Sequence, residues 1–314
     1  MRILIELPTW LGDSVMASAA VQSLALNYPN CKITFFGSEI STSIYSSYPN
    51  RENIIIDNSK KARFRLFYLL KTALNLDKFD IAISFRSHFY SKVFFKFIKA
   101  DKKAIFTPTK NEIHQVQKYI NFIIDCINLK KSTDELKLYF TPFKFKNKTL
   151  GINPGASYGS AKRWYPQYFA NVAINLKESY EVVVFGGKNE QNICDEIALE
   201  LKKNGVKYQN LCCKTTVCEL ASFIAGLDMF ITNDSGPMHI AAAFKVPTIA
   251  LFGPTKFKET SPYKNNNAKI LHLDLDCMPC MKRVCPLNSH ECMKNLTPKM
   301  VLDAIYTLNL QPRK

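Results

Sequence analysis

The residue best suited to act as a general base is Asp13, which follows the first apolar stretch of the chain in the run LPTWLGD. Gly12 permits a tight turn, and the stretch that follows has helical periodicity, so Asp13 falls at or next to a helix N-cap. A carboxylate there can cap the helix or remove a proton from a bound hydroxyl, and both interpretations stay open on local evidence. The other glycines of GxGxxG are missing, which argues against a nicotinamide enzyme.

A second loop has the composition of an anion site. It reads NPGASYGSAKRW from Asn153, and small residues such as Gly155 and Ser157 let backbone N–H groups approach a bound anion. Lys162 and Arg163 can neutralise phosphate oxygens. The GxxxxGKS or GxxxxGKT pattern of a P-loop is absent. The loop therefore predicts a diphosphate site of another kind, with a solvated basic turn as the alternative.

A third loop, NDSGPMH, begins at Asn233 and precedes a short apolar helix. Asp234 and Ser235 are residue types that cap helices, and the free N–H groups of a helix start that includes Gly236 attract anions. His239 follows inside the helix, where a histidine is more often a structural hydrogen-bonding residue than a catalyst.

These loops separate strands and helices that alternate along the chain. Apolar runs predict strands at 1–7, 31–37, 53–56, 80–85, 149–153, 181–186, 229–232 and 247–252, and helical periodicity occurs at 12–26, 64–76, 166–177, 190–203, 217–225 and 239–244. Such alternation predicts an α/β fold of parallel sheets covered by helices on both faces. The run FKFKNK interrupts the pattern, so two Rossmann-like domains with a boundary near residue 147 are expected. Ligands of such sheets bind beyond the carboxyl ends of the strands.

The charge of the chain is positive and unevenly distributed. Of a net +16, the segment from Ser59 to Lys110 contributes +10, because 13 basic side chains there face three acidic ones. Aromatic residues interleave with these cations. They could form a stacking surface for nucleic acid, or belong to helices whose lysines reach an anionic membrane or phosphorylated glycolipid, or the segment could simply be a solvated basic face.

Composition excludes several classes of protein. With 47% hydrophobic and 22% charged residues the chain is globular rather than disordered. No apolar run approaches the roughly 18 residues of a membrane span, and the start lacks a secretory leader, so a cytoplasmic protein is expected. Its ten cysteines are then reduced thiols or metal ligands. The spacing of four cysteines could close a structural zinc site, or these thiols could simply pack in loops. The four are Cys277, Cys280, Cys285 and Cys292.

Four motifs together resemble one family, the bacterial lipopolysaccharide heptosyltransferases of glycosyltransferase family 9. They are LPTWLGDSVMASAA, NPGASYGSAKRW, NDSGPMHIAAAFKVPTIALFGPT and the closing CMPCMKRVCPLNSHECM followed by LTP, and they span nearly the whole chain. The resemblance implies a GT-B fold of two Rossmann-like domains facing a central cleft. It assigns the acceptor to domain 1–147 and the donor to domain 148–314, with a last helix, about 298–308, that can pack back on the first domain.

The resemblance also implies substrates. The donor would be ADP-L-glycero-D-manno-heptose, and the acceptor a phosphorylated glycolipid, lipid A carrying Kdo and a first heptose, at the cytoplasmic face of the inner membrane. The protein would then be peripheral on that anionic surface, with no nucleic-acid partner. An inverting transfer needs a carboxylate on the acceptor side and cations on the side of the departing ADP. Such cations and helix N-termini can neutralise the diphosphate, so no cofactor or divalent metal is expected.

Residue roles carry over by motif. The resemblance makes Asp13 the catalytic base and Lys162 a group that assists the donor phosphates. The donor would be bound by Gly155, Ser157, Lys162, Arg163, Glu190, Asn233, Asp234, Ser235, Gly236 and His239. Within this set Glu190 would accept a hydrogen bond from the ribose. Trp10 and Gly12 adjoin the base, and charge alone suggests Lys60, Lys61 and Arg63 as acceptor contacts.

Two alternatives remain. A transferase of the same family could use a different sugar or position of attachment, as heptosyltransferases I and III do. A basic α/β protein that binds RNA would use the same cations without needing Asp13 or Lys162, and its affinity would depend strongly on salt.

Overall fold

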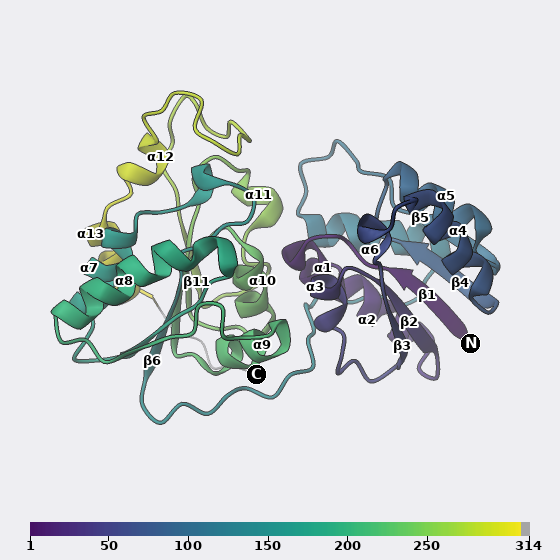
Figure 1. Ribbon diagram of the computed structural model, residues 1–314, viewed down its shortest axis with the longest axis horizontal. Helices are drawn as coiled ribbons and strands as arrows, with labels where there is room; N and C mark the ends of the chain where they lie inside the picture. Colours follow the sequence, from purple (N-terminus) through teal and green to yellow (C-terminus); the bar gives the residue numbers. More distant parts are fainter. Residues whose placement is uncertain (309–314) are drawn as a thin grey trace. The chain divides into compact units, whose positions relative to one another are not determined.

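The computed structural model describes residues 1–308 and divides into two compact units, one from Met1 to Tyr139 and one that begins at Phe140 (Figure 1). The boundary had been predicted near residue 147. It lies earlier because Phe143 already packs on the second unit: its ring centroid is 4.5 Å from that of Phe223, and its backbone N–H donates to the carbonyl of Ser222 at 2.9 Å. The last residues of the predicted second domain, 309–314, lie outside the described residues.

The first unit is built on a five-stranded parallel sheet with strand order β3-β2-β1-β4-β5. Its strands are β1 (Arg2–Glu6), β2 (Lys32–Gly37), β3 (Arg51–Ile56), β4 (Phe79–Ser84) and β5 (Ala100–Ile105). Its helices are α1 (Leu11–Met16), α2 (Ser18–Asn27), α3 (Glu39–Ser43), the short 3-10 helix η1 (Ser59–Lys61), α4 (Arg65–Asn75), α5 (Phe89–Phe97) and α6 (Gln115–Ile127). The single helix predicted at 12–26 is two helices, which meet at Ala17.

Alternate residues of β2 show how helices cover both faces of this sheet. Phe36 belongs to a core with Leu69 of α4 and Phe94 of α5. Phe35 points the other way and stacks on Tyr45, with Tyr48 at its edge. The Tyr48 hydroxyl donates to the carbonyl of Val21 in α2, and α2 in turn packs against α6. Both faces are therefore buried, as in other parallel sheets.

The second unit is built on a six-stranded parallel sheet with strand order β11-β10-β9-β6-β7-β8. Its strands are β6 (Thr149–Asn153), β7 (Glu181–Val184), β8 (Tyr208–Asn210), β9 (Met229–Asn233), β10 (Thr248–Leu251) and β11 (Ala268–Leu271). Its helices are η2 (Ser160–Lys162), α7 (Pro166–Asn175), η3 (Lys188–Glu190), α8 (Gln191–Lys203), α9 (Val217–Gly226), α10 (Gly236–Ala243), α11 (Phe257–Thr260), α12 (Glu291–Lys294) and α13 (Pro298–Tyr306).

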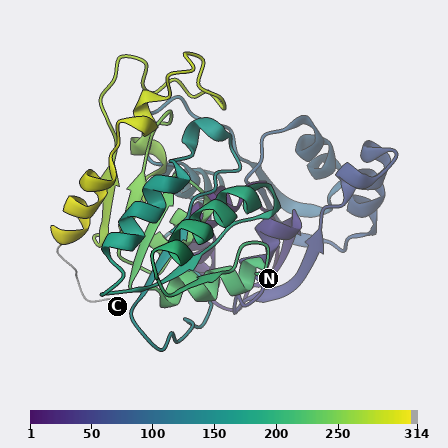
Figure 2. The same ribbon diagram turned by 60° about the vertical axis from the view of Figure 1, so that its left-hand side comes forward.

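One face of this sheet is covered by α7, α8 and α13, seen in front of the strands in Figure 2. The final helix, α13, places Val301, Ala304 and Ile305 in this core and packs against α7. Its buried face thus packs on the second unit, where the resemblance implied packing on the first. On the other face α10 contributes Met238 to a smaller core with Phe252.

The two sheets confirm the predicted α/β class. Among residues 1–308, no helix is both long enough and apolar enough to cross a membrane.

Candidate functional site

Four loops of the second unit converge at the carboxyl edge of its sheet. They follow β6, β7, β9 and β10, which are neighbours in the strand order, so the loops after them meet at one edge. Two of them, after β6 and β9, are loops that the sequence predicted as anion sites.

A buried ion pair joins the loops after β6 and β9. The Lys162 ammonium lies 2.5 Å from Oδ2 of Asp234, and their side chains are 12% and 5% exposed. The Thr255 hydroxyl donates to the same carboxylate oxygen at 2.6 Å, from the loop after β10. The Tyr158 ring lies 4.7 Å from the ammonium. Because each group is held by at least one other, the lysine is presented as a fixed cation at the sheet edge.

Thr255 was not predicted as a site residue. The only sequence signal was its place directly after the strand predicted at 247–252, in the run GPT. Thr255 contacts Asp234 because β10 lies next to β9 in the sheet. Local sequence patterns do not predict which strands are neighbours.

The predicted cap of α10 is not formed by its two candidate side chains. Ser235 is the N-cap residue but makes no side-chain cap hydrogen bond. Its hydroxyl lies 3.3 Å from the Asn153 amide instead, while Asp234 is engaged by Lys162. Gly236 begins the helix, and His239 is buried within it. Neither side chain therefore caps the first backbone N–H groups of α10. Such N–H groups at a helix start can bind an anion.

Asn233 ties the loop after β9 to the loop after β6. Its side-chain oxygen accepts the backbone N–H of Trp164 at 3.1 Å, and its amide donates to the carbonyl of Pro154 at 2.7 Å. Because the side chain is fully buried, we infer that it fixes the shape of the site. Ser157 is exposed on the same loop.

Glu190 and Gly155 pack together at the loop after β7. The Glu190 carboxylate is buried and accepts the Gly187 N–H at 2.7 Å. A Cβ added to Gly155 would lie 2.1 Å from the Glu190 carboxyl carbon, so only glycine lets these two loops approach so closely.

Arg163 follows Lys162 in the sequence and is the second candidate cation of this loop. Among the described residues its buried Nε has no hydrogen-bond partner. An unsatisfied buried donor is costly unless a ligand completes it, which makes Arg163 a fitting contact for an anion.

The cysteine-rich segment, residues 277–292, supports the Lys162 loop. The carbonyl of Arg283 accepts the Ala161 N–H at 3.0 Å, and the carbonyl of Met281 accepts the Tyr158 hydroxyl at 2.7 Å. His290 contacts the carbonyl of Ala161 through Nε2 at 3.0 Å. The segment thus holds the loop through two backbone carbonyls and one histidine side chain.

The zinc site considered for this segment is not formed. In residues 1–308 no group of three or more histidine, cysteine, aspartate or glutamate side chains is arranged to hold a metal ion. Cys292 is buried in the apolar core, and burial raises its pKa to about 11. Cys277 is exposed, and Cys280 and Cys285 are partly exposed.

In the first unit Asp13 lies within a helix and not at its N-cap. Trp10, half exposed, is the N-cap of α1, and Asp13 is in the first turn, beside the buried Gly12. Its negative charge adds to the burial that raises the pKa of Tyr119 on α6. The predicted position, at or next to the N-cap, was wrong because Asp13 lies three residues after Trp10. An acidic side chain in the first turn still interacts favourably with the helix dipole.

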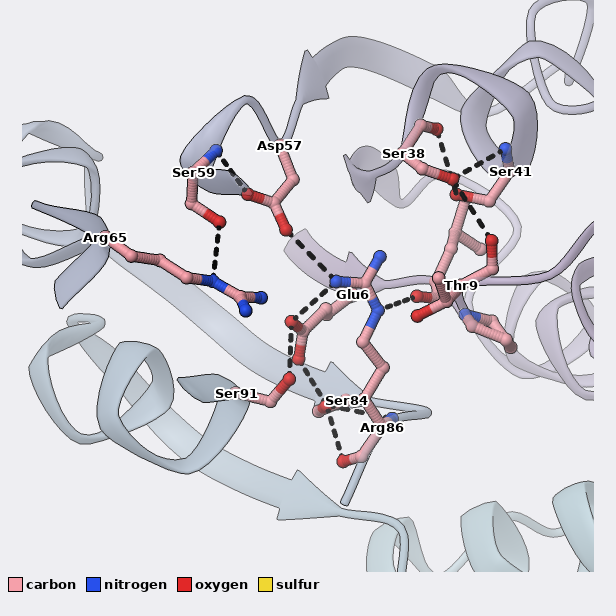
Figure 3. A network of polar contacts seen from close by, with 12 residues as sticks. Glu6, Thr9, Ser38, Ser41, Asp57, Ser59, Arg65, Ser84, Arg86 and Ser91 are labelled. Carbon is pink, nitrogen blue, oxygen red and sulfur yellow. Dashed lines mark hydrogen bonds and ion pairs between the residues drawn. The ribbon is translucent and has the colours of Figure 1, made fainter. Parts of the chain in front are cut away.

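A buried polar network contacts the end of β1, in the chain segment that leads into α1 (Figure 3). The Arg86 guanidinium donates from Nε to the carbonyl of Leu7 at 2.6 Å, and its Nη1 lies 3.2 Å from Asp57 and 3.5 Å from Glu6. Ser91 and Ser84 both donate to the Glu6 carboxylate. Burial raises the pKa of Glu6, and the Arg86 charge opposes that rise. The network joins the ends of β1, β3 and β4.

The network also contacts η1, the segment that carries two of the predicted acceptor cations. Asp57 accepts the Ser59 N–H at 3.0 Å, and Ser59 begins η1, which carries the exposed Lys60 and Lys61. Arg63 is also exposed, with its guanidinium 5.4 Å from the Phe64 ring. The carboxyl edge of the first sheet thus presents a carboxylate and several cations.

Comparisons with known proteins show which family this chain resembles. A family model described as glycosyltransferase family 9 (heptosyltransferase) matches residues 67–291. Lipooligosaccharide heptosyltransferase 2 of Campylobacter jejuni serotype O:6 is 47% identical, covering 98% of this chain and 99% of its own.

Two solved structures share the fold. That of E. coli ADP-heptose lps heptosyltransferase II superposes with a TM-score of 0.78 at 23% identity, covering 98% of both chains. That of E. coli heptosyltransferase WaaC with ADP has a TM-score of 0.80 at 16% identity, over 98% of this chain and 99% of the other. They confirm the predicted GT-B fold.

Proposed function

The chain belongs to glycosyltransferase family 9, and from this membership we propose that it moves L-glycero-D-manno-heptose from ADP-heptose to the first heptose of Kdo-lipid A, in the inner core of lipopolysaccharide. Its relatives' names support heptosyl transfer to a lipopolysaccharide or lipooligosaccharide. The observation that carries the proposal is the buried Lys162–Asp234–Thr255 cluster, which presents a fixed cation at the edge where a sugar diphosphate would bind.

The second unit binds the donor in this proposal. Lys162 and the unsatisfied Nε of Arg163 neutralise the diphosphate and stabilise ADP as it departs. The start of α10, with Gly236, adds backbone donors. Glu190 accepts a hydrogen bond from the ribose. Since protein cations meet the negative charge, the reaction needs no divalent metal.

The first unit binds the acceptor. Asp13 removes the proton from the attacking hydroxyl, and that oxygen displaces ADP from the anomeric carbon with inversion. Trp10 and Gly12 border the base, while Lys60, Lys61 and Arg63 meet the acceptor phosphates.

The acceptor is held in a membrane, so the protein acts as a peripheral protein at the cytoplasmic face of the inner membrane. The positive segment 59–110 suits an anionic lipid surface.

The test measures both products of the reaction. Purified protein is given ADP-heptose with one-heptose or Kdo-only lipid A, and ADP release is followed together with the mass of the glycolipid, which separates transfer from hydrolysis. We expect one added heptose on the one-heptose acceptor alone, with unchanged turnover in excess EDTA. Transfer to the Kdo-only acceptor would reassign the chain to a heptosyltransferase I activity. No transfer to either would contradict the proposed substrates, and loss of turnover in EDTA would contradict metal independence.

Gly155→Ala should weaken ADP binding about tenfold or more, equivalent to about 1.4 kcal/mol. The new methyl group would overlap the Glu190 carboxylate and push it from the ribose position. Isothermal titration calorimetry with ADP checks this. Gly205→Ala is the matched control. Gly205 has a φ of +67°, and a Cβ added there would meet no atom within 4 Å, so alanine strains the backbone at a position outside the donor site. Equal ADP affinity in both variants would remove Gly155 from the donor site.

A further inference from the structure

Four large apolar side chains near the starts of α4 and α5 are exposed. Phe64 and Phe67 are each 66% exposed, Phe89 is 64% exposed and Leu66 is 45% exposed. Single exposed apolar residues are ordinary, but a group of large ones indicates an interaction surface.

The arrangement of α4 and α5 brings these side chains into one region. The two helices pack side by side (Figure 1) and share the core that contains Leu69 and Phe94. The Arg65 guanidinium lies 3.7 Å from the centre of the Tyr90 ring, which joins the first turn of α4 to the first turn of α5. The exposed residues adjoin this contact in the sequence: Phe64, Leu66 and Phe67 flank Arg65, and Phe89 precedes Tyr90.

Exposed cations flank the apolar side chains along the chain. They are Lys60, Lys61, Arg63, Lys71, Lys92 and Lys96. Residues 58–76 and 85–100 contain no aspartate or glutamate. We call these six cations and the four apolar side chains the aromatic-basic surface. On α4, Phe67 and Lys71 are four residues apart and therefore share one side of the helix.

We propose that the aromatic-basic surface docks on an anionic lipid bilayer, with its phenylalanines and leucine in the headgroup layer and its cations against the phosphates of the bilayer lipids and of the membrane-held acceptor. Helices that lie in a membrane interface combine apolar side chains with basic ones in this way. The proposal rests on the proposed function in that the acceptor is membrane-held, and it adds which face of the first unit meets the membrane.

Nucleic acid fits this surface less well. Single-stranded nucleic acid is held by aromatic rings that stack on bases along a positively charged groove. Here one of the four exposed apolar residues, Leu66, offers no ring for stacking. Aliphatic and aromatic side chains are equally useful in a lipid interface.

Docking there would place the candidate base near the lipid headgroups. Both α5, which follows β4, and the loop 7–10, which follows β1 and leads into α1 with Asp13, begin at the carboxyl edge of the first sheet. The Arg86 network ties that loop to the segment that leads into α4. The starts of α4 and α5 and the start of α1, which carries Asp13, therefore lie at the same edge of the first sheet, where a saccharide projecting from the bilayer would meet them.

The first experiment measures sedimentation with vesicles in the absence of donor and acceptor. The full chain is mixed with vesicles of phosphatidylethanolamine and phosphatidylglycerol, or of phosphatidylcholine alone. We expect binding to the anionic vesicles, and at least a tenfold lower partition coefficient for Phe64→Ser/Phe67→Ser/Phe89→Ser. Leu199→Ser/Tyr306→Ser is the control, because these two second-unit residues are 53% and 70% exposed. It should bind as the wild type does.

A second measurement locates the contact without removing apolar side chains. Phe67→Trp should show a blue shift of its fluorescence with anionic vesicles and quenching by brominated lipid, whereas Leu199→Trp should show neither. The serine variant should keep its turnover on a delipidated, soluble acceptor but lose it on a bilayer-embedded one.

Three results would overturn the proposal: equal binding of the serine variant and the wild type, no binding of the wild type to anionic vesicles, or binding of single-stranded RNA in place of vesicles. Because vesicle binding is measured without substrates, failure here is separate from failure of heptosyl transfer.

Discussion

Replacing Asp13 with asparagine is expected to lower the turnover of heptosyl transfer by about 10²- to 10⁴-fold, the range typical of a lost general base. Asparagine keeps the size of the side chain and its place in the first turn of α1 but cannot accept the hydroxyl proton. The affinity for ADP should stay within about twofold, because the donor groups lie in the second unit and Asp13 in the first.

The measurements are initial rates with the one-heptose acceptor and calorimetry with ADP. Glu39→Gln is the matched control, since Glu39 is also an acidic residue in a first turn, that of α3, in the same unit. Turnover of the Asp13 variant equal to that of the Glu39 variant would remove Asp13 from the mechanism. Parallel loss of ADP binding would indicate damage to the fold.

Replacing Arg86 with methionine is expected to destabilise the first unit by about 3–5 kcal/mol, because it leaves two buried carboxylates without their cation. Glu6 and Asp57 are 2% and 7% exposed at the side chain, so water cannot replace the guanidinium. The variant also removes the hydrogen bond that holds the carbonyl of Leu7, in the loop that leads into α1 and Asp13.

Thermal unfolding checks this prediction, with an expected fall in Tm on the order of 10 °C. Arg2→Met is the control: Arg2 pairs with Glu52 and Asp77, but it is 38% exposed, and exposed pairs contribute about 0–1 kcal/mol. Adding Glu6→Gln to the Arg86 variant should recover part of the loss, since one buried charge is then removed. If the Arg86 and Arg2 variants unfold at the same temperature, the network does not stabilise the unit.

Central strands were predictable because burial on both faces leaves a continuous apolar run. The runs EVVV of β7 and TIAL of β10 are of this kind. The edge strand β3 was predicted at 53–56, but two other edge strands were missed because they are charged or short: β5 reads ADKKAI, and β8 has only three residues. The aromatic run of α5, interpreted only as part of the basic segment, is a helix with one buried side.

The candidate site could be predicted only as far as each loop carried its own signal. Lys162 and Asp234 were both singled out, but their ion pair depends on the pairing of β6 with β9. Glu6 lay inside an apolar strand pattern, and a charge in that place requires a buried partner. That partner, Arg86, is distant in the sequence, so local patterns could not identify it.

The cysteine-rich segment restricts where the chain can gain or lose residues. The carbonyls of Met281 and Arg283 are two residues apart and hold Tyr158 and Ala161, so a deletion between them would put one of the two out of reach. From Val284 to Asn288 the chain is largely exposed, and added residues there would extend into solvent. Length variation in this segment should therefore be tolerated only after Arg283 and before His290.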